Sequence, residues 1–231
     1  MIERLSRKCT KECSSVCLLS TLLIILSQHV SFGNYFRQGL SYGIDGMLYE
    51  TTGLYGKSKV RRINPHTFEV EHSVDIDEKY FGEGSTFFRD LNGNGRLIHI
   101  TWLEQTGFIY DSDTLQQLHE FNFTTTPPSH EGWGITYDAS NQEFIVSDGS
   151  KFLYFWDRDS LMEKRKVEVT RLDGSYQDQL NELEYMDGLV CCNIWYSDEI
   201  ICVDPTTGKS VREYGEKLLN KTSGVRCECF S

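Results

Sequence analysis

Apolar stretches along the chain end repeatedly in the same kind of turn, and these turns recur at a nearly constant interval. Each turn segment starts with an apolar residue, continues with Asn or Asp, and then contains Thr or Ser; the four segments are residues 63–70, 110–117, 156–163 and 203–210. Their starts lie 47, 46 and 47 positions apart. Because Asx and hydroxyl side chains hydrogen-bond the backbone of turns, the pattern predicts four equivalent hairpin turns.

Alternating apolar segments follow the same period. Their alternation is typical of half-buried strands, and they cover residues 47–50, 97–102, 144–147 and 189–195. Short connections such as Asp45-Gly46 and Asp187-Gly188 hold residues that tolerate the positive φ of tight hairpins. With almost no helical periodicity, each unit is predicted to be one four-stranded sheet. The fold class is therefore all-β, a β-propeller with four recognisable blades.

A third set of segments is in phase with the other two and covers residues 38–40, 83–85, 131–134 and 181–184. The first strand of each propeller blade lines the central channel, so side chains from these segments are expected to converge there. The candidates are Phe36, Gln38, Phe81, Glu83, Trp133 and Asn181, followed by Trp102 and Trp195 on the next strands. Aromatic rings around one carboxylate and two carboxamides are typical of a small-ligand site. Such residues also pack propeller hubs without binding anything, so the pattern alone predicts no more than a ligand-binding propeller.

Composition narrows the class of partner. The 231 residues are 39% hydrophobic and 25% charged, which is ordinary for one folded domain. The formal net charge is −11, and no basic stripe interleaved with aromatic residues offsets it. Nucleic acid is therefore not an expected partner.

The eight cysteines predict no metal site, because they do not form paired C-x-x-C knuckles. Cys191 and Cys192 are neighbours and must point to opposite faces of any strand. We interpret them as small buried residues. A disulfide from either one to Cys202 stays open as an alternative.

Residues 1–33 have the pattern of a targeting segment. Basic residues precede the apolar run 16–26, and small residues follow it. A secretory signal peptide is the favoured interpretation, with an uncleaved anchor or an inexact gene start as alternatives. The sequons at Asn122 and Asn220 agree with passage through the secretory route and predict glycosylation there. A membrane partner is expected only if residues 16–26 remain as an anchor.

Between residues 36 and 212 the chain resembles the plant and bacterial type of glutaminyl-peptide cyclotransferase, a family of five-bladed propellers. The resemblance rests on about ten short motifs in the family's order: residues 36–42, 48–58, 60–62, 81–84, 101–103, 107–111, 131–134, 147–149, 180–185 and 193–195. It implies closure of N-terminal glutamine of peptides or proteins to pyroglutamate with release of ammonia. It also implies that no metal or other cofactor is used.

The resemblance further implies a role for each matching residue. Glu83 is similar to the family's acid/base carboxylate and Asn181 to its carboxamide partner. Gln38 matches a second polar contact with the substrate. The aromatic walls of the family's site match Phe36, Phe81, Trp102, Trp133 and Trp195.

Two regions depart from the family pattern. The strand expected before Phe36 is not recognisable, and after about Leu219 the sequence no longer follows the family's fifth blade. We therefore expect a propeller domain over residues 34–219, a divergent tail over 220–231, and a ring that lacks most of its last blade. An incomplete ring is expected to be less stable because it leaves strand edges unpaired.

Two other functions compete with cyclisation. A non-catalytic peptide-binding propeller would keep the aromatic cage and lack the chemistry. A calcium-dependent lactonase-like propeller would need several oxygen ligands on the axis. Only Glu83, with Glu131 or Glu182 in addition, is available for that purpose.

Overall fold

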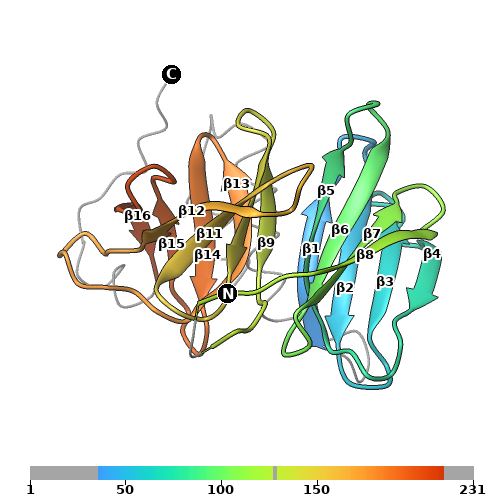
Figure 1. Ribbon diagram of the computed structural model, residues 1–231, viewed down its shortest axis with the longest axis horizontal. Coiled ribbons are helices and arrows are strands. Elements are labelled where there is room, and N and C mark those ends of the chain that lie inside the picture. The colour runs from blue at the N-terminus through green and yellow to red at the C-terminus, as the bar shows by residue number, and fades with distance from the viewer. Residues whose placement is uncertain (1–35, 127–128, 216–231) are drawn as a thin grey trace.

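The computed structural model describes residues 36–126 and 129–215, and these form sixteen strands in four antiparallel sheets (Figure 1). The first sheet contains β1 (Phe36–Tyr42), β2 (Leu48–Gly53), β3 (Lys59–Ile63) and β4 (Val70–Asp75). The second contains β5 (Gly82–Arg89), β6 (Gly95–Thr101), β7 (Thr106–Asp111) and β8 (Gln117–Asn122). The third contains β9 (Ile135–Asp138), β10 (Glu143–Ser147), β11 (Phe152–Asp157) and β12 (Glu163–Glu168). The fourth contains β13 (Leu180–Met186), β14 (Leu189–Ile194), β15 (Ile200–Val203) and β16 (Ser210–Tyr214).

Within each sheet the strands follow chain order, so every blade is a meander that begins at the hub. Strand β5 packs against both β1 and β9, and β9 packs against β13. The predicted four-bladed propeller arrangement is thereby confirmed for the residues described.

The repeated turn segments are the hairpins between the third and fourth strand of each blade. In the third blade, Asp157 Oδ1 accepts hydrogen bonds from the backbone N–H of Asp159 (3.2 Å) and Ser160 (3.0 Å). The same pair of contacts recurs at Asn64 and Asp111, and at Asp204 the backbone N–H groups of Thr206 and Thr207 donate to the side chain. The residue four positions after each has positive φ: Phe68, Leu115, Leu161 and Gly208. The predicted Asx turns are confirmed.

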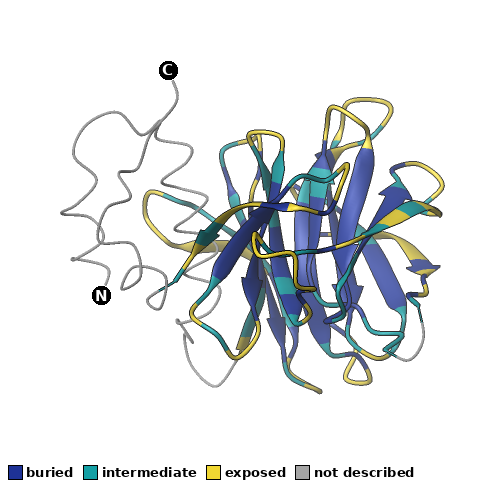
Figure 2. Ribbon diagram, turned by 90° about the vertical axis from the view of Figure 1, so that its left-hand side faces the viewer, coloured by how far each residue is buried: buried dark blue, intermediate teal, exposed yellow. Residues whose placement is uncertain are grey.

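Burial of the second strands differs from expectation. Strands β2, β6, β10 and β14 were expected to be half-buried, but most of their residues are buried on both faces (Figure 2). For β6 and β10 the physical reason is that the two middle blades have another blade against each face. Strand β10 shows this most clearly, with every residue buried. In the end blades the other face is covered from within the blade: Arg37 and Arg61 pair with Glu50 on β2, and Cys191 on β14 packs with Ile200 and Cys202.

Three apolar clusters fill the spaces between consecutive blades. Tyr49 and Leu97 pack between the first and second blades. Ile98 and Phe144 pack between the second and third, and Ile145 and Val190 between the third and fourth; the largest side chains in these clusters are almost fully buried. The first and fourth blades meet at the hub, where the Leu40 N–H donates to Glu182 Oε1 at 3.4 Å.

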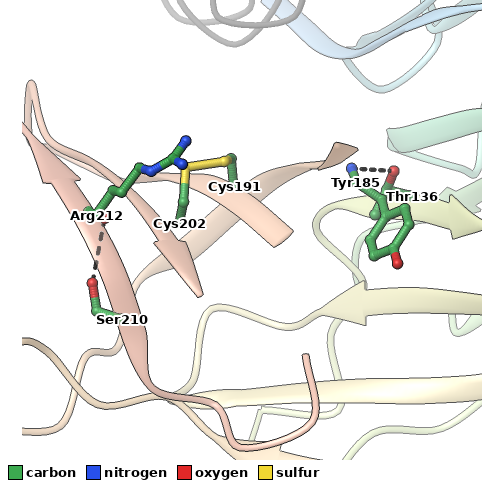
Figure 3. Close-up of a disulfide and its surroundings, with 6 residues drawn as sticks. All are labelled: Thr136, Tyr185, Cys191, Cys202, Ser210 and Arg212. Atoms are coloured by element: carbon green, nitrogen blue, oxygen red, sulfur yellow. Dashed lines mark hydrogen bonds between the residues drawn. A yellow bond between two sulfur atoms is a disulfide. The ribbon is translucent and has the colours of Figure 1, made fainter. Parts of the chain in front are cut away.

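A disulfide joins Cys191 on β14 to Cys202 on β15, two residues that are direct register partners (Figure 3). Our interpretation of Cys191 as merely a small buried residue is therefore wrong, because its register places it beside Cys202. Cys192 points to the opposite face and is buried as a free thiol, as expected. Burial raises the pKa of the Cys192 thiol to about 12.

Several expectations fall outside the described residues. These are the targeting segment 1–33 with its apolar run 16–26, the end of the propeller domain at 216–219, the tail 220–231, and the sequon at Asn220. Within the described part, no helix has the length and apolar character needed to cross a membrane.

Candidate active site

Close backbone contacts between the innermost strands build the hub. A Cβ on Gly134 would lie 2.2 Å from the Asn181 carbonyl oxygen, and one on Gly39 would lie 2.6 Å from the Ser85 nitrogen. The Gly84 N–H donates to the Trp133 carbonyl at 2.8 Å. Glycine is needed at these positions because a side chain would separate one blade from the next.

Hydroxyl side chains hold the same junctions. Thr51 Oγ1 donates to the Glu83 carbonyl at 2.6 Å, and Ser147 Oγ donates to the Asn181 carbonyl at 2.6 Å. These contacts tie Glu83 to the first blade and Asn181 to the third. The two predicted polar site residues therefore sit on inner strands whose backbones are fixed by neighbouring blades.

Aromatic residues from all four blades form two groups beside this hub. Phe81 lies with its ring centroid 5.6 Å from Trp102 and 5.3 Å from Tyr55, both edge to face. Trp133 lies 6.2 Å from Trp195, also edge to face. Such geometry is favourable for aromatic rings, and it makes apolar walls. The walls predicted at these four positions are thus grouped in pairs.

Gln38 and Phe36 differ in how the fold places them. Gln38 and Phe81 both pack against Gly53. A Cβ atom added to Gly53 would lie 2.2 Å from Phe81 Cε1 and 2.7 Å from Gln38 Cγ. Phe36 is the first residue of β1 and is 65% exposed. Its role as a wall of the site stays a prediction.

Glu83, the one carboxyl group among the predicted site residues, is buried at 7% exposure. Burial raises the pKa of Glu83 well above its usual range, and the nearby carboxylates of Glu131 and Glu104 raise it further. A raised pKa is typical of a carboxyl group that exchanges protons near neutral pH.

Further acidic residues surround this site, and the sequence patterns did not assign them to it. Glu104 accepts a hydrogen bond from the Tyr55 hydroxyl (2.8 Å). Burial raises the pKa of Tyr55 to about 12, with Glu104 and Glu83 adding to the effect. The only available signal for Glu104 was its position two residues after Trp102.

Glu182 and Glu184 are two more carboxyl groups on β13. Burial raises the pKa of Glu182 well above its usual range, and Glu184 and Glu83 add to this. Burial also raises the pKa of Glu184 to about 8. Within residues 36–126 and 129–215, no three His, Cys, Asp or Glu side chains are placed to hold a metal ion. The calcium-dependent alternative therefore gains no candidate site there.

Fold and site together define a β-propeller whose hub carries a buried carboxyl group of raised pKa beside paired aromatic walls. A family model described as glutamine cyclotransferase matches residues 8–226. The chain belongs to this family, as its resemblance predicted.

Individual relatives agree with the family. The chain is 37% identical over 188 residues to a glutaminyl-peptide cyclotransferase of Arabidopsis thaliana, covering 81% of this chain and 54% of the relative. It thus spans about half the length of that curated relative. The crystal structure of Myxococcus xanthus glutaminyl cyclase superimposes with a TM-score of 0.67 at 26% identity, covering 84% of this chain and 77% of the other.

A more distant structure shows the fold alone. The β-propeller domain of Cps50 (Swd1) from Myceliophteria thermophila has a TM-score of 0.54 at 13% identity, covering 80% of this chain and 59% of that one. This likeness therefore supports the β-propeller fold and carries no argument about the site.

Proposed function

We propose that this protein is a glutaminyl-peptide cyclotransferase, which converts N-terminal glutamine of peptides or proteins to pyroglutamate and releases ammonia. Glu83 carries the proposal: it is a buried carboxyl group of raised pKa in a chain of this family, and it lies within electrostatic reach of Tyr55 and of Glu131, which accepts hydrogen bonds from Trp102 and Trp133. The α-amine of the substrate is itself the nucleophile and has a pKa of about 7.7–8.0, so the protein needs no activated side chain of its own.

The proposed reaction needs one proton to be moved from the attacking nitrogen to the departing nitrogen. The α-amino nitrogen forms a bond to the side-chain amide carbon, and the bond from that carbon to the amide nitrogen breaks. Glu83 takes a proton from the attacking nitrogen and delivers it to the departing one, which leaves as ammonia. A carboxyl group of raised pKa suits both steps, because its carboxylate is more basic and its acid form persists closer to neutral pH.

The remaining site residues position the substrate. Asn181 would donate its side-chain amide to the developing oxyanion, a contribution of about 3 kcal/mol in a preorganised site. Phe81, Trp102, Trp133 and Trp195 would enclose the apolar stem of glutamine and exclude water. Folding the amine onto the amide carbonyl is an intramolecular arrangement that lowers the entropic barrier.

Incubation with a Gln-initiated peptide tests this function. The expected result is loss of one ammonia from the peptide mass, with release of ammonia into solution; the same peptide with N-terminal Asn serves as the control and should stay unchanged. Saturable binding of the Gln-initiated peptide without loss of ammonia would instead establish the peptide-binding alternative.

We also propose that the protein passes through the secretory pathway and is glycosylated at Asn122 and Asn220. Two observations support this: Asn122 is exposed at the end of β8, and Cys191 and Cys202 form a disulfide, a bond that persists in oxidising compartments. Enzymatic removal of N-glycans from the protein made in a eukaryotic host should increase its electrophoretic mobility, and Asn122→Gln should remove part of that shift. Unchanged mobility of the wild-type protein would contradict the proposal.

A further inference from the structure

One carboxylate oxygen connects the two aromatic groups of the site. Glu131 Oε2 accepts a hydrogen bond from Trp102 Nε1 at 2.6 Å and another from Trp133 Nε1 at 2.7 Å. Trp102 follows the last residue of β6 in the second blade, whereas Trp133 precedes β9 in the third. A single side chain therefore fixes indole rings that belong to different blades.

The backbone around Glu131 is itself held in place. Thr125 Oγ1 donates to the Glu131 carbonyl at 3.1 Å, and the Gly132 N–H donates to the Trp102 carbonyl at 2.9 Å. The Trp133 N–H donates to the Ser147 carbonyl at 3.0 Å. Because the loop is tied to both blades, the carboxylate has little freedom to leave the two indole N–H groups.

We propose that Glu131 is a positioning residue that holds Trp102 and Trp133 at a fixed separation, and so sets the shape of the pocket for the substrate's glutamine side chain. The inference rests on the proposed cyclotransferase function. Charged acceptors make shorter and stronger hydrogen bonds than neutral ones, and losing this acceptor would leave two indole donors without a partner. Neither indole would then be fixed relative to the other.

The same carboxylate acts on Glu83 through its charge. Glu131 and Glu104 are the charged groups that raise the pKa of Glu83 beyond the effect of burial, and Glu182 and Tyr55 also lie within electrostatic reach of Glu83. Removing the charge of Glu131 therefore lowers the pKa of Glu83. Glu131 thus has two separable effects, one geometric and one electrostatic.

Two substitutions separate these effects. Both indole bonds end on the same oxygen, so Glu131→Gln can keep both acceptor contacts through its amide oxygen while removing the charge. Glu131→Ala removes contacts and charge together. Glu163→Gln, at an exposed residue at the start of β12, is the matched control for loss of one carboxylate.

Indole NMR signals report the geometry whether or not the protein is active. The chain contains four tryptophans, so ¹⁵N labelling gives four assignable indole signals. We expect Glu131→Gln to keep the Trp102 and Trp133 N–H signals near their wild-type positions. Glu131→Ala should shift both and speed their exchange with solvent by about tenfold or more, while Trp156 in the core stays unchanged. Unchanged Trp102 and Trp133 signals in Glu131→Ala would overturn the proposal.

Kinetics report the consequence for the reaction. Glu131→Ala should raise KM by about tenfold or more. Glu131→Gln should keep KM within about threefold of the wild-type value. It should also lower the pKa that Glu83 contributes to the pH–rate profile, which is recognised because the profile of Glu83→Gln lacks it. Equal KM values in wild type and Glu131→Ala, or equal losses in Glu131→Gln and Glu131→Ala, would overturn the proposal. Absence of ammonia release from the wild-type protein would count against the proposed function instead, and the indole signals would still decide the role of Glu131.

Discussion

The outer turns and the hub of this propeller are built on opposite principles. At the outer turns, the four blades repeat one solution: an Asn or Asp side chain caps its own turn, and the residue four positions later has positive φ. At the hub, the equivalent positions differ in chemistry from blade to blade: Gln38 and Asn181 carry carboxamides, Glu83 a carboxyl group and Trp133 an indole. The residues that repeat from blade to blade therefore specify the fold, and the hub positions at which the blades differ specify the site.

The carboxyl groups of the outer turns and of the hub also differ in hydrogen bonding and in pKa. Turn carboxylates lie in contact with backbone N–H donors, and these bonds help lower the pKa values of Asp111, Asp157 and Asp204. Hub carboxyls are buried, and Glu182 Oε2 and Glu184 Oε1 have no hydrogen-bond partner among the described residues. Buried carboxyl oxygens without hydrogen-bond partners reduce stability, and such groups are typical of functional sites.

The largest effect is expected at Glu83. Glu83→Gln should lower turnover about 10²–10⁴-fold, because the amide cannot relay a proton. Its thermal unfolding temperature should equal or exceed that of the wild type, since a buried acid is removed. Steady-state ammonia release and thermal unfolding measure both. Turnover close to wild type would rule out the proton-relay role, and Glu163→Gln should match the wild type in both assays.

Next comes the backbone contact at the hub. Gly134→Ala should destabilise the protein by about 3 kcal/mol, because its Cβ would lie 2.2 Å from the Asn181 carbonyl oxygen. Gly93→Ala, at a hairpin turn with φ of +80° and no atom near its Cβ, should cost about 1 kcal/mol. Denaturant unfolding of both variants gives the comparison. Equal losses would mean that blade contact at the hub is not tight.

A third effect concerns His99, which is fully buried with neither ring nitrogen hydrogen-bonded among the described residues. Burial lowers the pKa of His99 to about 3. Because protonation then favours the unfolded chain, stability is lost as pH falls below about 6.5 towards 3, at about 1.4 kcal/mol per pH unit.

The variant His99→Leu removes this contribution. The stability difference between pH 6.5 and pH 5 should therefore be about 2 kcal/mol smaller in His99→Leu than in the wild type. Denaturant unfolding at the two pH values measures it. An identical pH dependence in both proteins would show that His99 is not buried as a neutral group.

The smallest effect is expected at an outer turn. Asp157→Ala should cost about 1 kcal/mol, since it removes the side-chain acceptor for the Asp159 and Ser160 N–H groups. Asp157→Asn should be nearly neutral, because Asn64 caps the equivalent turn in the first blade. Denaturant unfolding of the two variants should give unequal losses; a cost for Asp157→Asn as large as for Asp157→Ala would show that the charge, rather than the acceptor, matters.

Repetition also explains what could be predicted from the sequence. The blades, turn residues and inner strands recur at a fixed interval, so the position of Glu83 on an inner strand followed from its phase alone. The disulfide between Cys191 and Cys202 could not be predicted in this way, because the cysteine spacing left open which residue pairs with Cys202 until the strand register was known. The two hydrogen bonds from Trp102 and Trp133 to Glu131 could not be predicted either, because the repeat period does not specify the direction of a side chain.

A crystal structure of Glu83→Gln with a bound Gln-initiated peptide tests most directly whether residues of different blades form one site. Cyclisation at the hub requires the N-terminal glutamine to lie between Trp102 and Trp133, with its side-chain amide within hydrogen-bond reach of residue 83 and Asn181. A peptide whose N-terminus lies away from the hub, on an outer face of a blade, would contradict the proposed mechanism.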